Sequence, residues 1–411
     1  MNKPGRLLLL ILLLTNFKLW SDSADLYYNL SGAFGSFADP NTGLTIFPTL
    51  LIPIGGNLEG MGTAYTAVAN DSGFLEANPS GSSSLQYEEL SFLHHAWIAD
   101  SNIEGVIYTV RFNDLGIGFG GKFLYIPFTA YNDWGERSSR GYVSESIATF
   151  NISYNFFSNY KFYGLAVGSN LKIAYRNIPA TIYPDQSALA AMIDVGLLTR
   201  FNVFKTFISR SKNFSIGAVV KNLGFPALDE PLPTMITVGI AYSPIRPLLL
   251  AVDYNFPVSL DPVNYPAEQW DIASGINIDI TPFLSIQSGF RFKGDNPRIS
   301  VGSTLDLEKI SFIVNYNLDL SGRLNPMDKF SVEAKLNLGD RGRLAIQNQV
   351  EEHYLNGLES YAKGSLIEAI KFWEIALEID PTFTPARDHI TVAKKELELQ
   401  REMEIRLEIE N

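Results

Sequence analysis

Pro282-Phe283-Leu284-Ser285-Ile286-Gln287-Ser288-Gly289-Phe290-Arg291-Phe292-Lys293 alternates between apolar and polar side chains. Residues two apart share one face of a β-strand. One face of this stretch therefore carries Leu284, Ile286, Phe290 and Phe292, and the other carries Ser285, Gln287, Arg291 and Lys293. A transmembrane strand needs about 9 to 11 tilted residues, with apolar side chains toward lipid and polar ones toward the lumen. This stretch predicts such a strand.

The same alternation recurs fourteen times between Gln86 and Gly339. The stretches begin near Gln86, Ile103, Leu115, Tyr142, Tyr160, Ala188, Asn213, Pro233, Pro247, Glu268, Phe283, Arg298, Lys309 and Met327. The sequence predicts a mainly β fold, a fourteen-stranded antiparallel transmembrane β-barrel. The alternative is a soluble β-sandwich, which also alternates but does not separate short from long connections so regularly.

The composition agrees with a membrane barrel. Aromatic residues make up 12% of the 411-residue chain, with 27 Phe and 19 Tyr, which suits aromatic girdles at the membrane interfaces. Without cysteine, disulfides, thiolate catalysis and cysteine metal sites are excluded. The four histidines, His94, His95, His353 and His389, lack the spacing of a metal motif. A net charge of -12 without a basic cluster argues against nucleic acid as a partner.

Four regions follow one another along the chain. Residues 1–23 combine Lys3 and Arg6 with an apolar run from Leu7 to Leu14, the pattern of a signal peptide. Residues 24–85 are rich in small and polar residues and predict an N-terminal hatch or plug. Residues 86–339 hold the predicted barrel, and residues 344–411 change to a charged, helix-period sequence.

The predicted connections after even-numbered strands are tight or modest, whereas most of those after odd-numbered strands are longer, such as Pro127 to Arg140. Outer-membrane barrels have short periplasmic turns and longer outside loops. Because the strand number is even, the sequence predicts a cell outer-membrane protein with both termini in the periplasm.

The segment from Gly60 to Gly81 contains a small-residue run and the turn Asn78-Pro79-Ser80-Gly81. Gly60 and Gly62 permit close backbone approach, and Asn78-Pro79 is a turn signal. The segment resembles the hatch of the FadL-like outer-membrane transporter family and its PorV-like relatives, most closely an uncharacterised spirochaete branch. In that family the hatch lies inside a fourteen-stranded barrel. The alternative is a short periplasmic or edge-covering segment.

The third strand carries Gly116, Gly118, Gly120 and Gly121, which weaken ladder packing and favour a bulge or kink. FadL-like transporters release apolar ligands sideways at a kinked third strand, so the resemblance implies a lateral opening here. Alternatively, these glycines only make room for the plug.

Alternation places several charged residues on the lumen face, where they avoid the cost of a charge in lipid. These lumen candidates are Asp253, Arg291, Glu333 and Lys335. They could form a solvated or plug-contacting wall, or they could contact a ligand.

Beyond the barrel, Val350 to Pro381 resembles one tetratricopeptide repeat. The match rests on Gly357, Gly364, Ala369, Trp373, Ala376, Leu377 and Pro381. Small residues would let two helices approach, and Trp373 would fill the space between them. One repeat cannot bury its apolar face alone, and a following helix from Thr384 to Glu410 could cap it. The charges of that helix predict either a solvated face or a periplasmic partner surface.

No catalytic motif and no cofactor site is visible in the sequence, so it predicts a protein that is not an enzyme. The family resemblance implies passive uptake of hydrophobic molecules, long-chain fatty acids among them, through a plugged barrel. The alternative function is an outer-membrane scaffold or secretion shuttle that binds protein partners through the periplasmic repeat.

Overall fold

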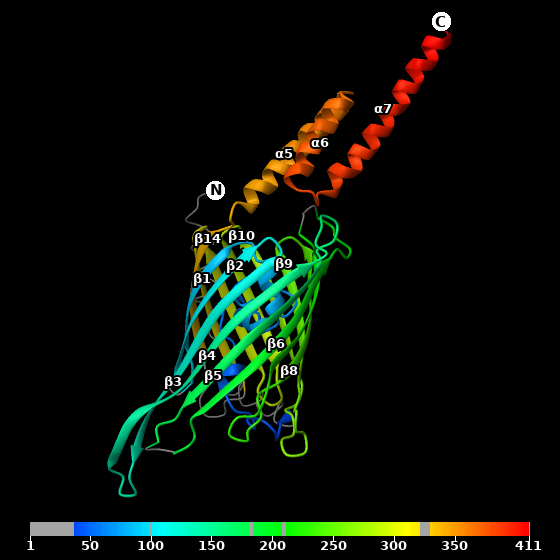
Figure 1. The fold of residues 1–411 in the computed structure, drawn as a ribbon. Coiled ribbons are helices and arrows are strands. Elements are labelled where there is room, and N and C mark those ends of the chain that lie inside the picture. Colours follow the sequence, from blue (N-terminus) through cyan, green and yellow to red (C-terminus); the bar gives the residue numbers. More distant parts are fainter. Residues whose placement is uncertain (1–36, 99, 181–183, 208–210, 321–328, 411) are drawn as a thin grey trace, which may run out of the picture.

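A computed structural model describes residues 37–98, 100–180, 184–207, 211–320 and 329–410. Fourteen antiparallel strands close into a barrel in which each strand pairs with its neighbours in sequence and β1 pairs with β14 (Figure 1). The strands are β1 (Glu88–Ala96), β2 (Asn102–Phe112), β3 (Leu115–Tyr131), β4 (Arg137–Phe156), β5 (Leu165–Asn177), β6 (Ala188–Phe201), β7 (Phe214–Gly224), β8 (Met235–Ile245), β9 (Leu248–Pro257), β10 (Asp271–Thr281), β11 (Leu284–Phe292), β12 (Arg298–Asp306), β13 (Ile310–Asp319) and β14 (Lys329–Gly339). The predicted barrel and its strand number are confirmed.

Side chains alternate between the outer surface and the lumen along each strand. In β11, Ile286 and Phe290 are 40% and 38% exposed on the outer surface, whereas Gln287 is fully buried inside. The outer surface is covered by Phe, Ile, Leu, Val and Tyr side chains of this kind. A closed sheet pairs its backbone groups between strands, and its outer face can therefore meet lipid.

The two ends of the barrel differ. The turn end holds the connections after even-numbered strands together with the start of β1 and the end of β14, and the loop end holds the connections after odd-numbered strands. Most loop-end connections are longer than the tight turns at β2–β3, β8–β9 and β10–β11. The β6–β7 connection, residues 202–213, is an exception at the turn end.

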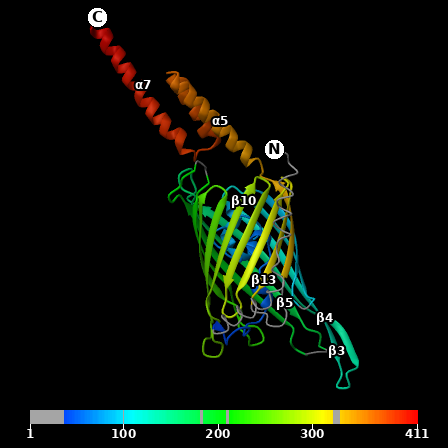
Figure 2. The same cartoon turned by 180° about the vertical axis from the view of Figure 1, so that it is seen from behind.

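Two predicted boundaries are wrong. Pro127 to Arg140 is not a loop, because β3 continues to Tyr131 and β4 begins at Arg137, so the hairpin projects beyond the loop end (Figures 1 and 2). The ring of Phe128 covers Gly141 across the pair; a Cβ on that glycine would lie 2.8 Å from the ring. An aromatic residue opposite glycine sustains pairing where Pro and Gly suggest a loop.

The fifth strand begins at Leu165 and not near Tyr160. The Asn159 side chain accepts hydrogen bonds from the backbone N–H groups of Lys161 and Phe162, at 3.0 and 2.8 Å. Such an Asx turn competes with strand pairing. The β4–β5 connection is therefore a folded turn.

A plug, defined as residues 45–85, crosses the lumen. The chain approaches it at the loop end, where Asn41 donates to the Ala267 carbonyl at 2.9 Å. Inside lie η2 (Pro48–Leu51), α3 (Gly56–Gly60), α4 (Phe74–Ala77) and η3 (Pro79–Ser84). The plug ends at the turn end, where Arg111 donates to the Leu85 carbonyl at 3.2 Å. In Figure 1 this blue segment lies within the barrel.

Three helices follow the barrel: α5 (Arg343–Ala362), α6 (Leu366–Ile379) and α7 (Thr384–Glu410). Trp373 of α6 is fully buried and donates to the Tyr354 carbonyl of α5 at 3.2 Å. A Cβ on Gly357 would lie 2.3 Å from the Trp373 ring, so glycine is required there. Ala369 and Ala376 are also fully buried. Gly364, with φ +80°, and Pro381 lie in the two interhelical turns.

The helices attach to the turn end of the barrel at two places. Arg343 donates to the Gln86 carbonyl at 2.6 Å, and Asp388 of α7 pairs with Lys161 of the β4–β5 turn at 2.8 Å. The Lys161 ammonium lowers the pKa of the Asp388 carboxyl. Beside this ion pair, the rings of Tyr160 and Phe383 meet edge to face at 5.1 Å. These contacts fix the helices over β1, β2 and the β4–β5 turn.

The predicted signal peptide, residues 1–23, lies outside the described residues. Within the part of the chain that the structure describes, no helix has the length and apolar character needed to cross a membrane.

Candidate functional site: the plugged lumen

Asp253 of β9 anchors the centre of the plug. Its Oδ2 accepts hydrogen bonds from the backbone N–H groups of Tyr65 and Thr66, at 2.9 and 2.8 Å, and the residue is 1% exposed. Bonds to an ionised acceptor are the stronger kind of hydrogen bond. Asp253 thus faces the lumen, and its carboxylate binds the plug backbone.

Glu333 and Lys335 of β14 hold the two ends of one plug loop. Glu333 accepts from the Gly56 N–H at 2.5 Å and from the Ser72 hydroxyl at 2.8 Å. Lys335 pairs with Asp71 at 3.0 Å. Both wall residues face the lumen, as alternation predicts, and both act on the plug.

The fourth lumen candidate, Arg291, pairs within the wall. Its Nε and Nη2 donate to the two carboxylate oxygens of Asp271, at 2.9 and 2.8 Å. The sequence reasoning missed further lumen ion pairs, among them Lys122 with Glu76 at 3.0 Å and Lys172 with Asp194 at 2.7 Å. The same alternation could have found both lysines, because each lies on the inward face of its strand.

The hatch glycines let the plug backbone touch the wall. Cβ atoms on Gly60 and Gly302 would each approach the other residue's Cα, at 3.2 and 3.0 Å. Gly62, with φ +63°, lies against Gly289 of β11, where a Cβ would come within 2.1 Å of the Gly62 nitrogen. Close approach without side chains is what glycine permits.

The Asn78-Pro79-Ser80-Gly81 turn is bonded to the wall and to itself. Asn78 is fully buried and donates to the carbonyls of Thr66 and Leu197, both at 2.9 Å. Its Oδ1 accepts from the Ser80 hydroxyl at 2.7 Å and from the Ser80 backbone N–H at 3.2 Å, and the second bond caps η3. Pro79 offers its carbonyl to the wall residue Asn151 at 2.9 Å. A Cβ on Gly81 would lie 2.5 Å from Phe74 Cβ.

Three of the four glycines of β3 face the plug, and the fourth does not. Cβ atoms on Gly116 and Gly120 would lie 2.2 Å from Ser82 and Leu75 of the plug, and one on Gly118 would lie 3.0 Å from Phe74. At Gly121 the nearest atom would be 3.8 Å away. The pairing of β3 with β2 and β4 is continuous through these positions. Room for the plug accounts for three of these glycines in this conformation, and the lateral opening stays a prediction.

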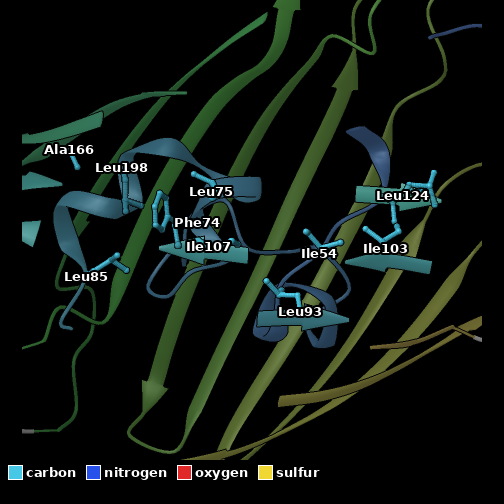
Figure 3. Close-up of a cluster of buried hydrophobic side chains, with 12 residues drawn as sticks. Ile54, Phe74, Leu75, Leu85, Leu93, Ile103, Ile107, Leu124, Ala166 and Leu198 are labelled. Carbon is cyan, nitrogen blue, oxygen red and sulfur yellow. The ribbon is translucent and has the colours of Figure 1, made fainter. Parts of the chain in front are cut away.

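An apolar cluster fills the space between the plug and the first strands (Figure 3). Phe74 and Leu75 of the plug lie fully or almost fully buried beside Ile107 of β2. Ile54, Leu93 and Ile103 lie near one another at the other side of the same cluster (Figure 3). The plug therefore combines polar anchors on β9 and β14 with an apolar contact on β1, β2, β3, β5 and β6.

Two neighbouring cavities between the loop end and the plug share part of their lining. The first, of about 30 Å³, is lined mainly by apolar side chains, including Leu44, Leu51, Leu232 and Tyr265. The second, of about 60 Å³, is called the chamber here and is lined by Leu51, Leu58, Lys172, Lys221, Met235 and Arg291, among others. Leu51 and Met235 line both cavities, so these two side chains separate them.

Lys221 of β7 is the distinctive group of the chamber. Lys172 and Arg291 are each paired with an aspartate. Lys221 makes no hydrogen bond or ion pair with any residue that the structure describes. Asp253, Asp194 and Glu76 act on Lys221 electrostatically but do not pair with it. A buried cation without a directly paired carboxylate is costly, and a bound anion would relieve that cost.

In the described ranges, no group of three or more His, Asp or Glu side chains is arranged to hold a metal ion. The lumen offers amides, hydroxyls, carboxylates and cations that bind one another across the plug interface.

Glu333→Gln is expected to lower the free energy of local opening around Gly56 by about 2 kcal/mol, because a charged acceptor of two plug donors becomes neutral. Hydrogen exchange of the residue 55–73 amides measures this. Glu308→Gln, at an exposed turn position, is the matched control and should change opening by less than about 0.5 kcal/mol. Equal exchange in both variants would show that Glu333 does not hold the plug.

Comparison with known proteins gives relatives in one organism. Two UPF0164 proteins of Treponema pallidum (strain Nichols) are 29% identical over 390 residues and 26% identical over 395 residues. The alignments span 91% and 86% of this chain, and 89% and 76% of the relatives.

Among solved structures, the crystal structure of a Pseudomonas aeruginosa FadL homologue aligns with a TM-score of 0.43 at 10% identity, over 70% of this chain and 99% of that chain. A mutant of the TodX monoaromatic hydrocarbon channel aligns with a TM-score of 0.41 at 11% identity, over 68% and 98%. The model of the Uncharacterised protein family (UPF0164) matches residues 32–341, and the chain therefore belongs to that family.

Proposed function

We propose that this barrel takes up hydrophobic molecules with an anionic end, long-chain fatty acids in particular, by passive passage through the plugged lumen of the outer membrane. The loop end faces outward, and the turn end faces the periplasm together with the three helices. The mostly longer connections at the loop end support this orientation.

The observation that carries the proposal is the order of the cavities. An apolar cavity at the loop end leads, past Leu51 and Met235, to the chamber, where Lys221 has no directly paired carboxylate among the described residues. Apolar burial would hold the chain of a ligand, and the lysine would receive its carboxylate. Both cavities are small in this conformation, so passage requires Leu51 and the rest of η2 to shift.

The sequence resemblance to FadL-like transporters supports the same class of ligand. Fold alone does not determine a substrate, so the test has to be direct. Purified, delipidated full-length protein is titrated with a fluorescent fatty acid and competed with unlabelled chains of different length. Saturable, chain-length-dependent binding is expected; a folded barrel that binds none of them would overturn the proposal.

Lys221→Gln is expected to weaken dodecanoate binding about tenfold, because one charge-assisted contact with the carboxylate is lost. Dodecanol, which has no charge, should compete equally well with both proteins. Lys309→Gln removes an exposed lysine at the turn end and is the matched control. An equal loss of affinity for dodecanol would mean that Lys221 maintains the shape of the chamber and does not bind the carboxylate of the ligand.

A scaffold or shuttle function is the second candidate. It is favoured by an apolar groove of about 720 Å³ between α6 and α7. The groove is lined by Leu366, Ile367, Phe372, Ile375 and Leu397, among others. Tetratricopeptide-like helices present such surfaces to partners. Deleting residues 343–411 should abolish partner binding while leaving fatty-acid binding intact. Equal loss of both, with the barrel still folded, would contradict this division of roles.

A further inference from the structure

A larger cavity lies on the other side of the plug, at the turn end. It has a volume of about 430 Å³, within the range of small-molecule sites. It is called the vestibule here, and its lining includes Asn57, Met61 and Tyr65 of the plug and Arg200, Lys212 and Arg246 of the wall and turns. Plug residues 57–65 thus separate the vestibule from the chamber.

The vestibule is amphipathic. Met61 and Val68 of the plug and Leu249 of the wall give it apolar surface. Arg200, Lys212 and Arg246 supply three cations, against the single lining carboxylate of Asp279. Apolar walls with a few convergent charges recognise an amphiphile with an anionic group.

The positive charge extends onto the neighbouring turns. The described residues of the β6–β7 and β8–β9 connections include Lys205, Lys212 and Arg246, and no Asp or Glu, whereas Lys161 of the β4–β5 turn is paired with Asp388. A concave site of one charge sign concentrates ligands of the opposite sign. The turn end as a whole is not basic, because the β12–β13 turn carries Asp306 and Glu308.

The vestibule is also free of the helices. They attach over β1, β2 and the β4–β5 turn, whereas β6 to β11 line the vestibule. Since β3 pairs continuously with both neighbours, the described wall shows no break at its glycines in this conformation. A molecule that passes residues 57–65 would therefore arrive directly in the vestibule.

We infer that the vestibule is a second, exit-side binding site for the anionic end of the transported amphiphile, with Arg246 and Lys212 as its main contacts, and that release is lumenal. The inference rests on the proposed uptake function and adds a site and a direction to it. The ligand moves from Lys221 in the chamber, past the plug, to the basic rim of the vestibule.

The test uses the absence of cysteine from the chain, which gives single-site labelling. Ser243→Cys places a fluorophore in the vestibule, and Thr45→Cys places one at the loop-end cavity. Full-length protein in lipid nanodiscs is titrated with nitroxide-labelled stearate, which quenches by contact, and with its uncharged methyl ester. Both labels should be quenched by the acid, and the vestibule label more weakly by the ester.

Adding Arg246→Gln and Lys212→Gln should raise the stearate concentration for half-quenching at Ser243→Cys at least tenfold and leave Thr45→Cys unchanged. Lys309→Gln, in another turn, should change neither. The inference fails if the vestibule label responds equally in the neutralised variant, or if only the loop-end label is quenched while binding persists. Quenching at neither position would remove the proposed uptake function itself.

Discussion

Gly116→Val is expected to dislodge the plug and give the barrel a stable ion conductance that the wild-type protein lacks. A Cβ at this position would lie 2.2 and 2.3 Å from backbone atoms of Ser82 and Ser83. Overpacking costs about 1 to 3 kcal/mol even where side chains can adjust, and a backbone obstacle costs more. Since η3 packs against β2 to β6, it can relieve the clash only by leaving its site.

Planar-bilayer recording measures the effect, with Gly121→Val as the matched control. That substitution makes the same chemical change in the same strand, but its Cβ would have no neighbour closer than 3.8 Å. The control should remain closed. Similar conductance in both variants would show that the β3 glycines serve the wall itself, as the lateral-opening prediction requires.

Trp373→Ala is expected to destabilise the three helices by about 3 to 5 kcal/mol, because a fully buried indole is removed from between α5 and α6. The small residues around it, Gly357, Ala369 and Ala376, cannot fill the space. Helical circular dichroism should then melt at a lower temperature, while the barrel keeps its resistance to heat and detergent.

The exposed residue Glu352 of α5, which does not line the groove between α6 and α7, provides the control, since Glu352→Ala should change stability by less than about 0.5 kcal/mol. If the scaffold function is correct, only the tryptophan variant loses partner binding. An unchanged melting temperature for Trp373→Ala would mean that the helices are held by the barrel rim and not by their own core.

The barrel could be predicted from the sequence because lipid imposes a local rule. Every second residue must be apolar, so Ile286 and Phe290 already give the facing of Gln287 and Arg291. The same rule places Glu333 and Lys335 inside. The rule also places Lys221 inside, because Lys221 shares the inward face of β7 with the buried residue Val219. The sequence analysis did not select Lys221.

The partners of these residues could not be predicted, because they depend on closure of the sheet and on the path of the plug. Nothing local connects Asp253 with Tyr65, which are 188 positions apart. The β3–β4 hairpin was missed for a related reason: Pro127 and Gly141 are turn signals alone, and only their cross-strand neighbours sustain the pairing.

The bonds of Glu333 and Lys335 to the plug also set an order of assembly. Ser72 and Glu333 are separated by 261 positions, and the plug precedes every strand whereas β14 is the last. Contacts of such long range form late and slowly in folding. The plug therefore receives its final anchors only when β14 pairs with β1. The moment at which residues 56–72 become immobile during refolding would then report when the β1–β14 pair forms and closes the barrel.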